Sequence, residues 1–313
     1  MKVLVFPGQG SQKIGMGYNL YKNYNEAKDV FDEVDDALDF KLSNLIFEGD
    51  LLELSMTSNT QPALMAVSIA VLKVLEKLTA KKIDNLFNFA CGHSLGEFTA
   101  LCACGVISLN TTSKLLRIRG QAMQEAVPKG EGAMAALISK DLSKLKDLLN
   151  EVNLLGTCQI ANDNSNEQIV VSGNVDAVKK LVEMAPEFSI KKSVMLNVSA
   201  PFHCDLMQPA QEKLELELAN VNFSKPLIPI ICNYNALPED SPINLKNNII
   251  QQVTNKVRWR EIMDFVKSNK VKNIVELGSG KVLTGFAKRL SFDIDCFQIE
   301  SKEDFEENLN KFN

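Results

Sequence analysis

The sequence predicts an α/β protein in which a smaller module interrupts a larger α/β body. Short apolar segments of strand length alternate with segments of helical spacing along most of the 313 residues. The middle of the chain departs from simple alternation: it runs strand, helix, strand, strand, helix, strand, the element order of a ferredoxin-like unit. At about 150 residues per domain, the length suits two domains or one large domain with an insertion.

Before this module, apolar spacing predicts two strands and four helices. The first strand ends in the Gly-rich turn PGQGSQ. Val30, Phe31 and Val34 recur at helical spacing, whereas the segment 62–78 is apolar on most sides, which indicates a helix enclosed by the core. Ser108 has the position of an N-cap. The predicted elements are strands at 3–6 and 88–91 and helices at 26–38, 62–78, 95–104 and 108–126.

The remaining elements divide between the module and the end of the chain. We expect a body of residues 1–127 and 199–313 and an insert of residues 128–198. In the insert, we expect strands at 134–139, 158–161, 169–172 and 189–198 and helices at 142–152 and 175–183. Beyond it, we expect helices at 206–219, 249–267 (with a break) and 282–290 and strands at 227–232 and 273–277.

Composition excludes several classes of protein. Hydrophobic residues make up 45% and charged residues 23%, which is ordinary globular composition. A net charge of -5 lacks the basic footprint of a nucleic-acid-binding protein. No apolar run approaches the ~18 residues of a membrane span, and the apolar start is too short for a signal peptide. Seven scattered cysteines without a CxxC pair, beside two histidines, exclude zinc spacing and indicate a reducing compartment. We therefore expect a cytoplasmic protein without nucleic-acid or membrane partners.

The sharpest local motif is Gly92-His93-Ser94-Leu95-Gly96, which fits G-x-S-x-G. This nucleophile elbow lies between a strand and a helix, as the segments here do. Its turn is so tight that side chains two residues before and after the serine would collide. The amino terminus of the following helix favours the negative charge of an acyl-transfer intermediate. The alternative is an N-cap serine in a glycine-rich turn.

A serine hydroxyl needs a base to become a nucleophile. His93 adjoins Ser94 in the chain and points in another direction, which leaves His203 as the candidate. The alternative for His203 is a hydrogen-bonded structural histidine. The third member of the site stays open, because the acidic residues between Ser94 and His203 lie mostly in the insert. A backbone carbonyl or an amide side chain could orient the histidine instead.

The glycine-rich turn near the amino terminus and a pair of arginines are further candidates for the site. The turn from Gly8 to Gly10 matches neither the dinucleotide nor the Walker pattern, so it either presents backbone N–H groups at the end of a strand or is a plain turn. Arg117 and Arg119 are two residues apart on a predicted helix and face different ways. An inward guanidinium must be paired, and a substrate carboxylate would serve. The alternative for either arginine is a solvated helix face.

Taken together, six motifs resemble the family of malonyl-CoA:acyl-carrier-protein transacylases. They are GQGSQ, GHSLGEF, IRG…MQEAVP, CQIAN…VVSG, SAPFHC and ELGSGKVL, in the order and spacing of the family over essentially the whole chain. The resemblance implies an α/β-hydrolase-like body with a mainly parallel sheet and a ferredoxin-like insert. It also implies transfer of malonyl from malonyl-CoA to the pantetheine thiol of acyl carrier protein, for fatty acid biosynthesis, by a ping-pong mechanism and without a cofactor or metal.

The resemblance also implies roles for individual residues. Ser94 is the nucleophile and His203 the base, and the main-chain carbonyl of Gln252 orients the histidine. Arg119, rather than Arg117, binds the malonyl carboxylate. The backbone N–H groups of Gln9 and Leu95 form the oxyanion hole, and Phe202 is a variant often present in malonyl-selective members. Of these assignments, Gln252 depends on a stretch that varies within the family.

Two other functions compete with this one. A serine esterase or thioesterase would share the elbow and the histidine and transfer the acyl group to water, but the HGGG segment typical of esterases is absent and Arg119 would have no purpose. The second is a non-enzymatic docking module for carrier protein. Because carrier proteins are acidic, we expect a local basic patch on a monomeric enzyme. Lys191-Lys192 and Lys288-Arg289 are candidates, and the alternative is that these are ordinary solvated side chains.

Overall fold

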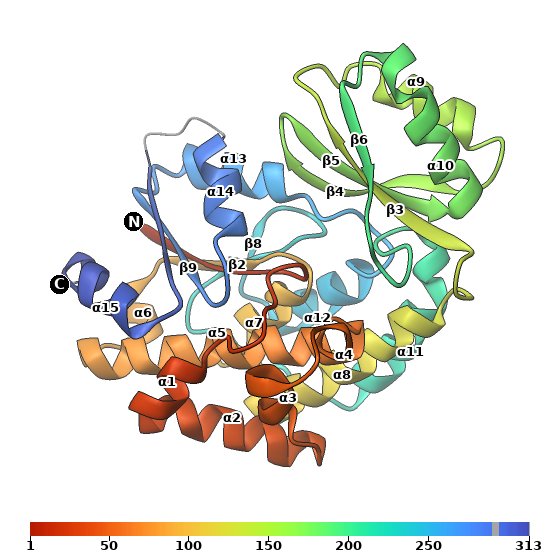
Figure 1. Cartoon of the computed structure of the whole chain (residues 1–313). Helices are drawn as coiled ribbons and strands as arrows, with labels where there is room; N and C mark the ends of the chain where they lie inside the picture. Colours follow the sequence, from red (N-terminus) through yellow and green to blue (C-terminus); the bar gives the residue numbers. More distant parts are fainter. Residues whose placement is uncertain (290–293, 313) are drawn as a thin grey trace.

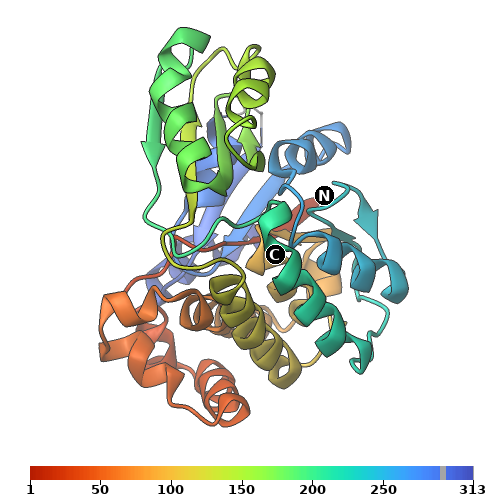
Figure 2. The same cartoon turned by 90° about the vertical axis from the view of Figure 1, so that its right-hand side faces the viewer.

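The chain forms a mixed α/β structure with two separate β-sheets. The computed structural model describes residues 1–289 and 294–312. A larger sheet lies among most of the helices, and a smaller sheet with two helices stands at one end of the molecule (Figures 1 and 2). In the views of these two figures the smaller sheet projects above the rest of the chain.

The larger sheet has the strand order β10-β9-β1-β2-β7-β8 and is parallel except for β8. Its register pairs Phe6 with Gly92, so β1 and β2 end side by side. Loops that follow the carboxyl ends of adjacent parallel strands meet at one edge of a sheet, which is where sites form in α/β proteins. The strands are β1 (Lys2–Phe6), β2 (Phe89–Gly92), β7 (Ile230–Ile231), β8 (Pro238–Glu239), β9 (Asn273–Leu277) and β10 (Asp295–Ile299).

The smaller sheet is antiparallel, in the order β4-β5-β3-β6. Its strands are β3 (Gly132–Ile138), β4 (Cys158–Ser165), β5 (Gln168–Asn174) and β6 (Lys192–Met195). Helices α9 (Leu145–Val152) and α10 (Val175–Met184) pack on it and share a hydrophobic cluster of its own, which includes Leu148, Val171 and Val178. A parallel bridge between Asn162 and Val257 and an ion pair between Arg260 and Asp163 are among the contacts of this sheet with the rest of the chain.

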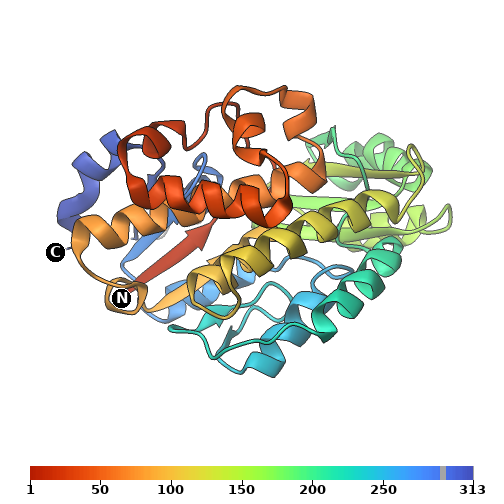
Figure 3. The ribbon, with the colours of Figure 1, turned by 90° about the horizontal axis from the view of Figure 1, so that it is seen from below.

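The other helices surround the larger sheet. Helix α5 is buried along most of its length, as its apolar sequence predicts, and lies beside α2 and α8 (Figure 3). These helices are α1 (Tyr18–Asn23), α2 (Asn25–Leu38), α3 (Leu42–Glu48), α4 (Leu51–Leu54), α5 (Thr57–Thr79), α6 (Ile83–Leu86), α7 (Leu95–Ala103), α8 (Leu109–Glu125), α11 (Gln208–Ala219), α12 (Pro242–Gln251), α13 (Trp259–Ser268), α14 (Val282–Arg289) and α15 (Lys302–Asn308).

Most predicted elements are present, with different lengths. The helix predicted over 249–267 is two helices, α12 and α13, with the predicted break between them. The strand predicted at 227–232 contains two paired residues, and that at 189–198 contains four. The Ser108 side chain accepts from the Thr111 N–H, as an N-cap does. The last residue of the predicted helix 282–290 lies outside the described residues. None of the helices in the described part of the chain is long and apolar enough to cross a membrane.

Candidate active site

Ser94 occupies a strained turn between β2 and α7. Its φ of 54° and ψ of −108° fall outside the usual regions for a residue with a side chain. A Cβ on Gly92 would lie 2.0 Å from the Gly96 carbonyl oxygen, and a Cβ on Gly96 would lie 2.4 Å from the Phe6 carbonyl oxygen. Both glycines are therefore required by close backbone approach. The structure has the strand–turn–helix context that the G-x-S-x-G motif predicts.

His203 reaches the Ser94 hydroxyl although the two residues are 109 positions apart. Its Nε2 lies 2.7 Å from Ser94 Oγ, and its Nδ1 lies 2.9 Å from the main-chain oxygen of Gln252. A carbonyl oxygen only accepts, so Nδ1 carries the hydrogen and Nε2 is free to accept from the serine. Burial, followed by the nearby charge of Arg119, lowers the pKa of His203 to about 3. The imidazole is therefore neutral at physiological pH.

His93, the neighbour of Ser94 in sequence, faces elsewhere. Its Nε2 lies 2.9 Å from the Asn164 side-chain oxygen, and its ring lies 5.7 Å from that of Trp259. Burial lowers the pKa of His93 to about 4. The prediction that His93 and Ser94 point in different directions is confirmed.

Arg119 points inward to the site, whereas Arg117 does not. Arg119 is 1% exposed, and its Nη2 donates to Ser94 Oγ at 3.1 Å and to the Gln252 side-chain oxygen at 2.9 Å. Its Nη1 donates to Gln61 Oε1 at 2.7 Å. Burial lowers the pKa of Arg119 to about 10, so the guanidinium stays charged at neutral pH. Arg117 instead bonds to Asn59 on α5.

The guanidinium also has unused hydrogen-bonding capacity. Arg119 Nε is buried and has no hydrogen-bond partner within the described residues. No carboxylate forms an ion pair with Arg119 in that part of the chain. A buried cation without an ionic partner is costly, and it therefore favours an anionic ligand next to Ser94.

Sequence reasoning missed three polar residues of the site, of which Asn233 and Glu97 support the elbow and Gln61 accepts from Arg119. The Asn233 side-chain oxygen accepts from the Ser94 N–H at 2.8 Å, and its Nδ2 donates to the Gly92 carbonyl oxygen at 2.7 Å. Glu97 Oε2 accepts from the Asn233 N–H at 3.0 Å and from Gln252 Nε2 at 2.6 Å. Gln61, on α5, is the third. Only Glu97 had a signal in the sequence, because it follows the motif directly in GHSLGEF.

The reacting groups open into a cavity of about 570 Å³. Ser94, His203 and Arg119 line it, together with Gln9 and Leu95. Leu95 is the first residue of α7, where a backbone N–H has no partner within the helix. Phe202 also lines the cavity, and the Ser172 hydroxyl donates to its carbonyl oxygen at 2.6 Å. Residues of the smaller sheet and its flanks, Met134, Asn162 and Leu196–Val198, complete the wall.

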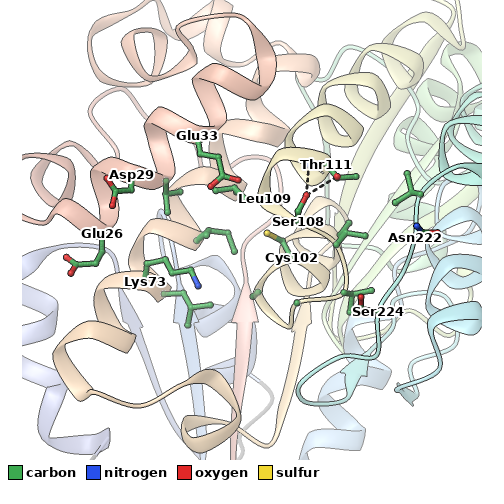
Figure 4. Close-up of a pocket in the computed structure, with 18 of the residues that line it drawn as sticks. Glu26, Asp29, Glu33, Lys73, Cys102, Ser108, Leu109, Thr111, Asn222 and Ser224 are labelled. Carbon is green, nitrogen blue, oxygen red and sulfur yellow. Dashed lines mark hydrogen bonds between the residues drawn. The ribbon is translucent and has the colours of Figure 1, made fainter.

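A larger cavity, of about 820 Å³, lies between α2, α5, α7 and α8 and does not contain these groups (Figure 4). The cysteine that lines it is Cys102, whose pKa burial raises to about 12, so little thiolate forms at neutral pH. Neither histidine lines this cavity. Within the described residues, no group of three or more His, Cys, Asp or Glu side chains could hold a metal ion.

Comparison with known proteins identifies the family of the chain. The model of the acyl transferase domain matches residues 3–279. A malonyl CoA-acyl carrier protein transacylase of Bacillus subtilis is 42% identical over 96% of this chain and 94% of its own length, and one of Salmonella typhimurium is 36% identical over 91% of each. The crystal structure of an acyl-carrier-protein S-malonyltransferase from Bartonella henselae has a TM-score of 0.96, at 48% identity and 99% coverage of both chains. The chain therefore belongs to the acyl transferase family, among the malonyl CoA-acyl carrier protein transacylases.

Proposed function

We propose that this protein transfers the malonyl group of malonyl-CoA to the pantetheine thiol of acyl carrier protein through a malonyl ester on Ser94. One observation carries the proposal: the Ser94 hydroxyl lies 2.7 Å from a neutral imidazole and 3.1 Å from a buried guanidinium. The first contact supplies a base, and the second supplies a partner for an acyl group that ends in a carboxylate.

In the first half-reaction, Ser94 Oγ attacks the thioester carbon while its proton passes to His203 Nε2. The Gln252 carbonyl at 2.9 Å holds the imidazole in the tautomer that can accept this proton and stabilises the imidazolium that forms. The backbone N–H groups of Gln9 and Leu95 hold the tetrahedral oxyanion, and each contributes about 3 kcal/mol, as measured for other oxyanion holes. Collapse breaks the C–S bond, and CoA leaves with the proton from Nε2.

The second half-reaction repeats these steps with a different thiol. The pantetheine thiol gives its proton to His203, the thiolate attacks the malonyl ester, and the serine oxygen leaves with the returned proton. This is ping-pong acyl transfer. Every bond change uses groups of the chain and its two substrates, so we propose that the reaction needs no cofactor or metal.

Malonyl selectivity follows from Arg119. A malonyl carboxylate accepts from the guanidinium as a charge-assisted pair, with the unpartnered Nε as one available donor. An acetyl group would leave the buried cation without a charged partner, which costs about 1–3 kcal/mol or more. Phe202 narrows the same cavity and is proposed to contact the acyl chain.

The hydrolytic alternative lacks support from the relatives. The relatives from Bacillus subtilis and Salmonella typhimurium carry the name of the malonyl transacylase, and one similar structure is a malonyl-transacylase in complex with a type II PKS acyl-carrier protein, with a TM-score of 0.95 and 34% identity. We assign the reaction to fatty acid biosynthesis. We further propose a monomer in the cytoplasm, where the seven free cysteines suit a reducing compartment.

We propose a more specific description of the fold from the strand order of the smaller sheet and from the serine elbow. The four strands of the smaller sheet belong to a βαββαβ unit. Across the sheet they lie side by side in the order fourth, first, third, second, which supports a ferredoxin-like insert of residues 128–198. The serine elbow between a parallel strand and a helix supports an α/β-hydrolase-like body of residues 1–127 and 199–313.

Intact-protein mass spectrometry after incubation with malonyl-CoA tests the function. The expected result is a malonyl adduct on the wild-type chain, absent from Ser94→Ala and discharged when carrier protein bearing pantetheine is added. Release of free malonate in place of malonyl carrier protein would support the hydrolase instead. An adduct that persists in Ser94→Ala would move the nucleophile to another residue.

A further inference from the structure

Glu97 is a buried carboxyl group that the reaction steps do not use. It is 0% exposed, lies in the first turn of α7 and has no ion-pair partner in the described part of the chain. Burial of a carboxyl group costs free energy unless its oxygens accept hydrogen bonds. Only one of its two oxygens does so: Oε2 accepts from Gln252 Nε2 and the Asn233 N–H, whereas Oε1 has no hydrogen-bond partner among the described residues.

The Gln252 side chain lies between this carboxyl group and Arg119. Its Nε2 faces Glu97 at 2.6 Å, and its Oε1 accepts from Arg119 Nη2 at 2.9 Å. A carboxylate only accepts and a guanidinium only donates, so the two neighbours fix which end of the amide faces which. A flipped amide would set two acceptors against each other at one end and two donors at the other.

We propose that Glu97 is a positioning residue for malonyl selectivity: through the side-chain amide of Gln252 it holds the Arg119 guanidinium beside Ser94. This inference rests on the proposed function, because it assigns Arg119 to the malonyl carboxylate. The group of Gln252 that contacts His203 is its main-chain carbonyl and not this amide. Loss of the Glu97 acceptor therefore affects acyl selectivity more than the serine–histidine chemistry.

The proposed role of Glu97 depends on an acceptor oxygen within reach of Gln252 Nε2 and not on the negative charge of the carboxylate. Burial raises the pKa of Glu97 to about 7. In the protonated form, the unpartnered Oε1 can hold the proton while Oε2 still accepts from Gln252 and Asn233. Two variants distinguish the position of the acceptor oxygen from the charge of the carboxylate. Glu97→Gln keeps the length and one acceptor oxygen, and Glu97→Asp keeps the charge but withdraws the oxygens by one methylene.

The experiment measures malonyl and acetyl transfer from the two CoA thioesters to the enzyme, in competition, by mass spectrometry. We expect Glu97→Asp to lower the malonyl-to-acetyl ratio by about tenfold or more, the effect of a lost hydrogen bond to a charged group, and to raise the KM for malonyl-CoA. We expect Glu97→Gln to keep the wild-type ratio. Circular dichroism checks that each variant is folded.

The other outcomes overturn the inference. If Glu97→Asp slows both acyl groups equally, Glu97 only supports the elbow. If folded Glu97→Gln loses selectivity, charge rather than the acceptor position is the cause, and this result is decisive even when Glu97→Asp does not fold. Failure of the proposed function itself is distinguishable, because the wild-type chain would then form no malonyl adduct or show no malonyl preference.

Discussion

The two histidine regions of this protein share their burial and differ in their chemistry. His93 and His203 are both buried, and burial lowers both pKa values, to about 4 and about 3. His93 bonds to an amide side chain on β4, whereas His203 connects a main-chain carbonyl to the Ser94 hydroxyl. A perturbed pKa therefore does not distinguish the histidine that we propose as the base from the other one. The partner on each ring nitrogen does.

Replacement of the two histidines tests this comparison with the largest expected effect. We expect His203→Ala to slow malonyl transfer by about 10³-fold or more, because the serine loses its base. His93→Gln is the matched variant and retains most of the activity. The rate of malonyl-enzyme formation in single-turnover experiments is the measurement. Comparable losses in both variants would contradict the different roles of the two histidines.

Arg119→Ala sharpens the comparison, because the guanidinium donates to the same Ser94 hydroxyl that His203 contacts, whereas His93 does not contact that hydroxyl. We expect malonyl transfer to fall by about 10- to 100-fold relative to acetyl transfer, since a charge-assisted pair is lost and the buried cation no longer requires a charged partner. Competition between malonyl-CoA and acetyl-CoA gives this ratio. Arg117→Ala is the control, because Arg117 bonds to α5 outside the cavity. An unchanged acyl preference in Arg119→Ala would refute its role.

Sequence reasoning can propose a site residue when its chemistry depends on a local motif or when its residue type is rare in the chain. Ser94 lies within a motif that needs two glycines, and with two histidines in the chain the base followed by elimination. Asn233 could not be found in this way, because it acts on Ser94 from 139 residues away and amide side chains are common. Gln252 came from the family resemblance alone.

The same limit applies to the fold. Helices α2, α5 and α8 were predicted from apolar spacing sustained over many residues. Short helices such as α3 and α4 were not predicted, because one or two turns establish little periodicity. Strand β10 also escaped prediction. Its five residues pair with β9 at an edge of the larger sheet, and that long-range pairing is not visible in its sequence.

The shared property of the histidines gives a prediction about stability. Each folded-state pKa lies below the ordinary value of 6.5, so the unfolded chain binds more protons between about pH 4 and 6.5, and stability falls as the pH falls through this window. From pH 7 to pH 5, each histidine accounts for a loss of about 2 kcal/mol. Urea unfolding at the two pH values measures it. In His93→Gln the loss of stability from pH 7 to pH 5 should be smaller by about 2 kcal/mol, the contribution of one histidine. A loss identical to that of the wild type would contradict the buried neutral state of His93.

The smallest expected effect concerns carrier-protein docking, at two pairs of exposed basic residues. Lys191 and Lys192 are exposed just before and at the start of β6, and the residues that follow this strand line the cavity. Lys288 and Arg289 are exposed at the end of α14, which packs against β4. Either pair of basic side chains would attract an acidic carrier protein, and added salt would screen this attraction.

Charge reversal of each pair to glutamate tests this docking surface. We expect discharge of the malonyl-enzyme by carrier protein to slow by about two- to fivefold at low salt, since an exposed charge contributes about 0.2–1 kcal/mol, and the difference to shrink as salt is added. The control is Lys28→Glu with Lys114→Glu, two exposed lysines on α2 and α8 that do not line the catalytic cavity. A pair whose reversal slows discharge no more than this control does lies outside the docking surface, because net charge alone then explains the effect.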